Sequence, residues 1–320
     1  MNILITSAGR RVELVESFQN AVAVLGLSQQ TKVFCADLEP KLSSACVISD
    51  KAFALPLAKS EEYPEALLKL CLDREIKLVI PTNDNELPIF AKHRQHFQEH
   101  GVKLIISDTQ LVEKCRDKRL TGDIFDLFHI RYPNIYQTDA IRFPCFCKPY
   151  DGSSSVGAHI INSNDELNQA ALADPKNMFM ELIPKRFKEY TVDAYFDAEN
   201  TLRGLVPRER LAVRAGEVAK GITRKNYVYK KLRESISVVP GAIGCLTIQV
   251  FGDPETEEIV GLEVNPRFGG GYPLSVAAGA DYSKKLIEEY LLGERVGDLD
   301  NWRDNLLMLR YDAKVVVDNA

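Results

Sequence analysis

Three segments after residue 145 carry side chains whose types and spacing suit phosphate chemistry. The first is a hairpin whose strand-like sides flank the run 150–158, which is rich in glycine and serine. Its backbone N–H groups and the hydroxyls of Ser153, Ser154 and Ser155 can bind phosphate oxygens, and Lys148 at its base supplies a positive charge. Lys148 follows no glycine run and no helix opens after it, so this is not a Walker loop. Taken alone, the segment fits a plain surface hairpin equally well.

The second segment is a strand end that could bind a flat base. The apolar run 179–183 ends one strand, and Glu189 begins the next alternating strand. An exposed strand edge offers a backbone carbonyl and an amide at a spacing that suits the amine and ring nitrogen of adenine. The carboxylate of Glu189 can accept hydrogen bonds from ribose hydroxyls.

The third segment places oxygen donors on neighbouring strands. Gln249 lies on one expected strand, and Glu263 and Asn265 lie two residues apart on the next. Strand alternation puts Glu263 and Asn265 on the same face, with Arg267 just beyond the strand end. Three such oxygens suit a Mg²⁺ ion that bridges nucleotide phosphates, although the same pattern also occurs on polar sheet faces without a ligand.

The first hundred residues predict a base for these segments. Short apolar runs alternate with amphipathic stretches, which is typical of βαβ units around a parallel sheet; the runs are 2–6, 32–36, 77–81 and 102–106. Ligands of such sheets lie beyond the carboxyl ends of the strands, here at 7–11, 37–40 and 82–86. The run 7–11 lacks the spaced glycines of a dinucleotide site, which disfavours an NAD-dependent oxidoreductase.

From about residue 111 the α/β pattern gives way to an α+β pattern. We expect helical stretches first, then strands from residue 145 to about 241, with a helix over 227–239 near the end of that range. A strand over 245–251 follows, then a final helix over 275–292 and a tail strand over 314–317.

Composition excludes several classes of partner. The 320 residues carry 40 basic and 45 acidic side chains, a net charge of −5, so we expect no nucleic-acid partner. No run is long and apolar enough to span a bilayer, and the amino terminus lacks the features of a secretory signal, so we expect no membrane partner. The seven cysteines form no C-x-x-C pair and are read as reduced thiols, which predicts a cytoplasmic location.

Taken in order, these segments resemble the ATP-grasp superfamily, in the branch similar to carbamoyl-phosphate synthase large subunits and related carboxylate–amine ligases. The resemblance rests on Asp117-Lys118, Lys148 and its loop, 181–183, Glu189, Gln249 and Glu263-Val-Asn265-Pro-Arg267. It covers nearly the whole chain. It implies a Rossmann-like pre-ATP-grasp domain over 1–110 and an ATP-grasp domain over 111–320, with a mobile lid subdomain at about 120–180.

The resemblance also implies a role for each matching residue. ATP would be bound by Lys118, Lys148, Ser153, Ser154, Ser155, Glu181, Leu182, Ile183 and Glu189. Mg²⁺, with Mn²⁺ as an alternative, would be bound by Gln249, Glu263 and Asn265. Lys148 and Arg267 would be catalytic, with Arg267 on the transferring phosphoryl group or the acceptor carboxylate. Substrate contacts would come from the cationic stretch of Arg208, Arg210, Arg214 and Lys220.

The implied function is an ADP-forming, ATP-dependent ligase that joins a small carboxylate to an amine through an acylphosphate. Two departures from the family pattern are the three consecutive serines of the loop and the run 268–271, Phe-Gly-Gly-Gly, after Arg267. The second departure and a length for one grasp unit argue against carbamoyl phosphate synthesis itself. A nucleotide-binding regulatory or scaffold protein without turnover is the alternative. The oligomeric state stays open, with a homodimer among the options.

Overall fold

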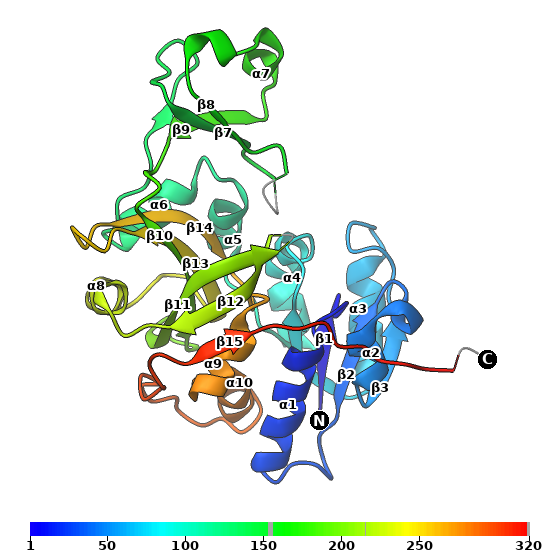
Figure 1. Ribbon diagram of the computed structural model, residues 1–320. Helices are drawn as coiled ribbons and strands as arrows, with labels where there is room; N and C mark the ends of the chain where they lie inside the picture. Colours follow the sequence, from blue (N-terminus) through cyan, green and yellow to red (C-terminus); the bar gives the residue numbers. More distant parts are fainter. Residues whose placement is uncertain (153–155, 215, 319–320) are drawn as a thin grey trace.

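Residues 1–152, 156–214 and 216–318 are described by a computed structural model, in which they form three β-sheets with helices packed around them (Figure 1). Ser153, Ser154 and Ser155 lie outside the described residues, so their expected part in phosphate binding stays a prediction. None of the helices in the described part of the chain is long and apolar enough to cross a membrane.

The N-terminal domain is built on a parallel sheet of order β3-β2-β1-β4-β5. Its strands are β1 (Asn2–Thr6), β2 (Val33–Asp37), β3 (Lys51–Ala54), β4 (Ile76–Pro81) and β5 (Lys103–Leu104). Its helices are α1 (Val12–Val24), the 3₁₀ turn η1 (Pro40–Leu42), α2 (Ser44–Ile48), α3 (Tyr63–Asp73) and α4 (Leu87–Glu99). The expected α/β architecture is confirmed. The differences are small: β3 is an additional edge strand, and β5 is shorter than the apolar run over 102–106.

A six-stranded antiparallel sheet of order β14-β13-β10-β11-β12-β15 forms the centre of the molecule. Its strands are β10 (Lys188–Phe196), β11 (Leu202–Arg214), β12 (Glu217–Thr223), β13 (Gly244–Gly252), β14 (Ile259–Asn265) and β15 (Leu307–Leu309). The helices of this region are α5 (Thr109–Arg116), α6 (Thr121–Leu127), α8 (Tyr227–Ser235), α9 (Tyr272–Ala278) and α10 (Tyr282–Tyr290).

A small sheet of order β6-β9-β7-β8 projects from one end of the molecule, opposite the N-terminal domain (Figure 1). Its strands are β6 (Ile135–Tyr136), β7 (Cys145–Pro149), β8 (His159–Ile161) and β9 (Asn177–Glu181), with η2 (Asn164–Glu166) and α7 (Gln169–Ala173) on it. We call residues 135–181 the lid subdomain. Its own core contains the buried side chains of Cys145, Cys147, Ile161 and Phe179.

The lid subdomain therefore begins later than the expected position of about residue 120. Residues 121–127 form α6, whose Ile124 and Phe125 are fully buried and pack in the core of the six-stranded sheet. Gly261 on β14 has no side chain, and a Cβ there would lie 2.4 Å from the ring of Phe125. This close approach makes α6 part of the central region.

Three expected elements after residue 220 were wrong in their bounds. The helix expected over 227–239 ends at Ser235, because residue 238 pairs with Thr201 in an isolated bridge. The expected final helix is interrupted at Gly279, which adopts φ +109 and separates α9 from α10. The tail strand lies at β15, where it pairs with β12, and not at 314–317.

The first helix of the N-terminal domain, α1, packs against α10 of the central region as well as against its own sheet. Val15 and Phe18 on α1 belong to the same hydrophobic core as Tyr282 and Leu286 on α10. The hydroxyl oxygens of Ser17 and Ser283, 266 residues apart, lie 2.7 Å from each other in this core. The contact joins the N-terminal domain to the central region through a shared core.

Candidate functional site

A cavity of about 730 Å³ is lined by residues of the six-stranded sheet, of the small sheet of the lid subdomain, and of loops and α4 in the N-terminal domain. The expected site residues that line it are Lys118, Lys148, Glu181, Leu182, Ile183, Glu189, Arg208, Arg210, Gln249, Glu263, Asn265 and Arg267. Lys220 is not among the lining residues; it is exposed on β12, opposite Leu309 of β15. Arg214 is also outside the cavity and pairs with Asp312 near the chain end.

One end of the cavity is apolar and enclosed by two sheets. The lid subdomain contributes Phe146 and Met180, and the six-stranded sheet contributes Phe251 and Leu262. The carboxylate of Glu181 already has a partner within the protein, because Arg131 Nη1 donates to its Oε2 at 2.7 Å. The side chain of Glu181 is therefore engaged, and its backbone with that of Leu182 and Ile183 is what the strand end offers to a flat base.

Glu189 and Arg210 form an ion pair beside this apolar end. The distance from Arg210 Nε to Glu189 Oε1 is 3.2 Å. Burial raises the pKa of Glu189 above its ordinary value, although the positive charge of Arg210 opposes the shift. Hydroxyl groups of a sugar would find a carboxylate acceptor and a guanidinium donor at this position.

Lys148 presents a buried ammonium group to the cavity. Its side chain is 7% exposed, and no carboxylate of the described residues lies within ion-pair distance of it. Burial, aided by the nearby charge of Lys118, lowers the pKa of Lys148 to about 8, while Glu263 acts in the opposite direction. A buried cation without a partner is costly, so an anionic ligand at this point would bind it strongly.

Lys118 connects this cation to the base of the serine-containing hairpin. Its backbone N–H donates to Tyr150 O at 3.0 Å, and its ammonium group donates to Gly152 O. The guanidinium of Arg119 lies 3.7 Å from the centre of the Tyr150 ring. The two lysines thus lie together at the junction of the lid subdomain and the central region.

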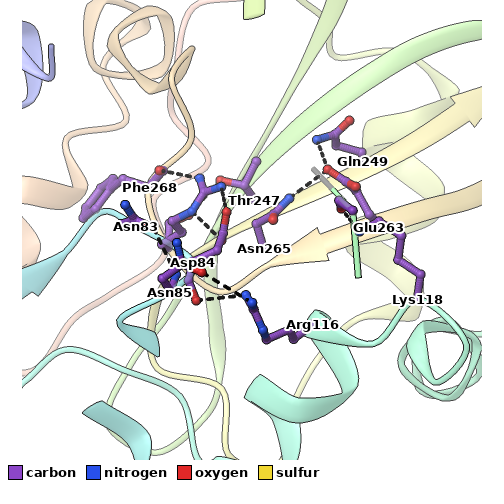
Figure 2. A network of polar contacts seen from close by, with 12 residues as sticks. Asn83, Asp84, Asn85, Arg116, Lys118, Thr247, Gln249, Glu263, Asn265 and Phe268 are labelled. Carbon is purple, nitrogen blue, oxygen red and sulfur yellow. Dashed lines mark hydrogen bonds and ion pairs between the residues drawn. The ribbon is translucent and has the colours of Figure 1, made fainter. Parts of the chain in front are cut away.

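Glu263 lies between two amide side chains on neighbouring strands (Figure 2). Gln249 Nε2 donates to Glu263 Oε1 at 2.7 Å, and Asn265 Nδ2 donates to the same oxygen at 3.0 Å. The register that pairs Gln249 with Glu263 explains their proximity. No group of three His, Cys, Asp or Glu side chains that could hold a metal occurs among the described residues, so this site has one carboxylate.

The donor set at Glu263 fits a magnesium ion that also binds phosphate. A rotation of each amide would turn its oxygen toward the carboxylate side, which gives three protein oxygens of the kind Mg²⁺ prefers. One carboxylate and two amides leave room in the coordination shell, and Mg²⁺ in nucleotide sites is usually bound by one or two carboxylates together with substrate phosphates.

Arg267 forms a two-pronged ion pair with a residue of the N-terminal domain. Its Nε and Nη2 donate to the two carboxylate oxygens of Asp84 at 2.7 and 2.6 Å. Burial acts to lower the pKa of Arg267, but the Asp84 carboxylate outweighs it and the pKa is raised above its ordinary value. The guanidinium is therefore charged and fixed in orientation at the end of β14.

Arg208 is held in a buried ion pair and is not a freely available substrate ligand. Its Nε and Nη2 donate to Asp193 at 2.8 and 3.0 Å, and Ser275 Oγ donates to the same carboxylate at 2.6 Å. Its Nη1 is buried and has no hydrogen-bond partner within the described part of the chain. Only this third nitrogen is left for a ligand.

Sequence reasoning missed two charged residues of the N-terminal domain that line the cavity, Arg11 and Asp84. Each follows the carboxyl end of a parallel strand, β1 for Arg11 and β4 for Asp84. The segments 7–11 and 82–86 were expected to face a ligand for this reason, but the sequence did not indicate which side chains would reach it. The partner of Asp84 in the central region, Arg267, is 183 residues away along the chain.

Two family models match separate parts of this chain. The model described as PylC-like, N-terminal domain, matches residues 3–105. The model described as ATP-grasp in the biosynthetic pathway with Ter operon matches residues 173–311. A carbamoyl phosphate synthase large chain from Bifidobacterium adolescentis is 22% identical over 233 residues, which cover 64% of this chain. The matched part is 20% of that relative, so this chain resembles a fifth of its length.

Solved structures share the whole fold at low sequence identity. The biotin carboxylase domain of Hydrogenobacter thermophilus 2-oxoglutarate carboxylase, a dimer in complex with MgADP, ADP and bicarbonate, is 16% identical with a TM-score of 0.71. The match covers 96% of this chain and 73% of that one. An L-amino acid ligase from Bacillus licheniformis is 16% identical with a TM-score of 0.66, over 91% of this chain and 74% of that one. These similarities establish the fold.

Proposed function

Because this chain belongs to the ATP-grasp superfamily, with a PylC-like N-terminal domain, we propose that it is an ATP-dependent ligase that activates a small carboxylate as an acylphosphate. The superfamily is one of ADP-forming ligases, so ligase-type chemistry with ATP follows from the fold. The observation that carries the proposal is Lys148, an almost fully buried ammonium group at the cavity wall that forms no ion pair with the residues the structure describes.

In the proposed reaction a carboxylate oxygen attacks the γ-phosphorus of ATP. The bond from the γ-phosphorus to its bridging oxygen breaks, and ADP leaves with the electron pair. An amine then attacks the acyl carbon, the carbon–oxygen bond to the phosphoryl group breaks, and inorganic phosphate leaves. The amine gives up its proton to solvent. No protein nucleophile takes part, since phosphoryl transfer depends mainly on positioning and charge.

The residues of the cavity divide between the nucleotide and the reaction. Adenine binds in the apolar end at Leu182 and Ile183, and the ribose hydroxyls bind Glu189. Lys118 and Lys148 bind the phosphates, and Lys148 neutralises charge that develops in the transition state.

The magnesium site and Arg267 complete the proposed centre. Gln249, Glu263 and Asn265 would hold Mg²⁺, which supplies neutralisation of phosphate charge when it is bound. Arg267, held in place by Asp84, faces the transferring phosphoryl group or the acceptor carboxylate. Asp84 acts on the reaction through Arg267 and is a positioning residue.

Hydroxylamine trapping tests this function directly. An acylphosphate reacts with hydroxylamine to give a hydroxamate, so wild-type protein with MgATP and a panel of carboxylic acids should yield ADP and a hydroxamate for the accepted acid. Glu263→Gln should lose both products, because an isosteric amide replaces the carboxylate that is proposed to bind the metal. The matched control is Glu255→Gln, an exposed carboxylate in the turn between β13 and β14, which should behave as wild type.

Calorimetry separates the outcomes. If wild-type protein binds MgATP but forms neither ADP nor hydroxamate across the panel, the scaffold alternative replaces the ligase. If Glu263→Gln turns over like wild type, the metal assignment is wrong. If wild type does not bind MgATP, both nucleotide-dependent functions fail.

A further inference from the structure

Arg11 is a charged residue of the N-terminal domain that the proposed reaction has not used. It lies between β1 and α1 and lines the cavity with Asp84 and Arg267. Burial, together with the positive charge of Arg267, lowers the pKa of Arg11 to about 10. In the described residues no hydrogen bond or ion pair engages this guanidinium, whereas its exposed neighbour Arg10 lies 3.9 Å from Glu217. Arg11 is thus a half-buried cation with unused donors.

The carboxylates near Arg11 already have partners. Asp84 is neutralised by Arg267, and Glu217 receives a hydrogen bond from Arg310 Nη1 at 2.9 Å. The positive charge of Arg11 is therefore in excess at this end of the cavity. A group that fills the space should be an anion, because it would restore local neutrality and satisfy the free donors.

The glycine run after Arg267 lies beside this space. A Cβ at Gly270 would lie 3.7 Å from Arg11 Nη1, which is an ordinary contact distance, whereas a Cβ at Gly271 would overlap Arg208 Nη1. Arg208 Nη1 is the buried nitrogen that has no partner among the described residues. Two guanidinium groups therefore approach neighbouring residues of one side-chain-free turn. Two glycines of the run 268–271 thus have a steric reason, because a Cβ at Gly269 would crowd Thr247 and a Cβ at Gly271 would overlap Arg208.

The loop that carries Arg11 is fixed by buried polar contacts beneath it. Glu86, fully buried, accepts hydrogen bonds from Ser7 Oγ at 2.7 Å and from Tyr63 OH at 2.6 Å. Asp37 Oδ2 accepts from Gly9 N at 2.8 Å, at a backbone position with φ +49. A loop held at both of these points is preorganised, and a preorganised donor binds a ligand without an ordering cost.

We propose that Arg11 binds the carboxylate group of the acid substrate and holds it at the end of β14, beside Arg267. The inference rests on the proposed ligase function and adds the N-terminal domain as the source of acid recognition. The nucleotide phosphates are assigned to a different cation pair. Lys118 and Lys148 interact electrostatically with each other and with Glu263, whereas the charges that act on Arg11 are those of Asp84, Glu217, Arg267 and Arg310.

Ligand-observed NMR with acetate as the carboxylate probe tests this assignment on the full chain at constant ionic strength. Wild-type protein should bind acetate saturably, and Arg11→Met should weaken that binding at least tenfold while the affinity for MgADP changes less than twofold. Arg11→Lys should recover part of the loss, because lysine restores the positive charge but not the pair of guanidinium nitrogens that can bind both carboxylate oxygens. The matched control is Arg10→Met, which removes an adjacent guanidinium whose side chain is 88% exposed and should change acetate binding less than twofold.

Three outcomes would overturn the assignment. In the first, wild type and Arg11→Met bind acetate with equal affinity. In the second, wild type does not bind acetate saturably. In the third, Arg11→Met loses affinity for acetate and for MgADP to the same extent. Thermal unfolding checks each variant, and Arg11→Gln takes the place of Arg11→Met if that variant does not fold. Arg11-dependent acetate binding without hydroxamate formation would contradict the proposed ligase function and leave the anion site standing.

Discussion

The cavity has two walls of opposite construction, the lid subdomain and the N-terminal domain. The lid strands pack against one another, around the small core that includes Cys147 and Phe179, and contribute Lys148. The N-terminal wall is tied to the rest of the protein by the Asp84–Arg267 ion pair and by a hydrophobic core shared with α10. Its loops are fixed by the buried carboxylate of Glu86 and the half-buried carboxylate of Asp37.

This contrast suggests that the two walls have different functions, one in nucleotide binding and the other in binding of the acid. The lid subdomain has its own small core and carries Lys148, the cation proposed to bind phosphate; we propose that this subdomain opens for nucleotide entry and closes on the bound nucleotide. The wall with many contacts carries the residues assigned to the acid, whose placement relative to the γ-phosphate must be accurate. The four predictions that follow test the independence of the lid, the rigidity of the opposite wall, and the chemistry assigned to each.

The largest effect is expected from Phe179→Ala in the lid core. Removal of a buried phenyl ring costs about 3–5 kcal/mol, but here the loss should stay local to a subdomain with its own core. Hydrogen exchange of β7 and β9 amides should accelerate at least tenfold, while the main urea transition keeps its midpoint. The control is Ile160→Ala on β8, whose side chain is 43% exposed. A parallel drop of the main transition would show that the lid is not independent.

Glu86→Ala should act on the whole N-terminal wall. The change removes the acceptor of the buried hydroxyls of Thr6 and Tyr63, for an expected loss of about 3 kcal/mol in the free energy of unfolding. Urea denaturation should show this loss in the main transition. Glu65→Ala on the exposed face of α3 is the control and should cost less than 0.5 kcal/mol by the usual range for surface changes, about ±0.5 kcal/mol. Stability equal to wild type would mean that the loop does not depend on Glu86.

Arg267→Lys tests the chemistry where the central sheet meets the N-terminal wall. The charge is kept but the fork that engages Asp84 is lost, so hydroxamate formation should slow by about 1–3 kcal/mol of transition-state stabilisation. The affinity for MgATP should change much less, and calorimetry measures it in parallel. A variant that loses MgATP binding yet keeps its rate at saturating ATP would make Arg267 a ground-state ligand of the nucleotide.

The smallest effect is the pH dependence of nucleotide binding through Lys148. Its pKa of about 8 means that the ammonium form dominates at pH 7 and is lost as the pH rises above 8. Since phosphate binding requires the charged form, the Kd for MgATP should rise about tenfold between pH 7 and pH 9. Lys148→Arg stays charged and should give a flat profile over that range. An equally steep profile in the arginine variant would assign the titration to another group.

Much of the fold was predictable because its signals are local. The central strands β1 and β4 are buried on both faces and therefore read as continuous apolar runs. The alternation of β14 was enough to place Glu263 and Asn265 on one face. The break between α9 and α10 also had a local signal, Gly279 followed by the helix cap Asp281, inside the range expected as one helix.

The parts that could not be predicted depend on pairings between distant residues. Nothing in the neighbourhood of Arg208 indicates that Asp193 lies across from it and removes it from the surface. The register of β11 and β12 shifts between Arg210 and Val213, so simple alternation does not describe which cationic side chains reach the cavity. The pairing of Asp84 with Arg267 likewise becomes visible only when the two domains are placed together.

The core that α1 shares with α10 has a consequence for the order in which the protein is made. Ser17 leaves the ribosome 266 residues before its partner Ser283. At about 5–20 residues per second, roughly 13–50 s pass before the covering helix exists. During that time the apolar face of α1, with Val15 and Phe18, has no partner from the later part of the chain. The nascent N-terminal domain is therefore a natural client for a chaperone that holds exposed helices, and slow translation should increase that need.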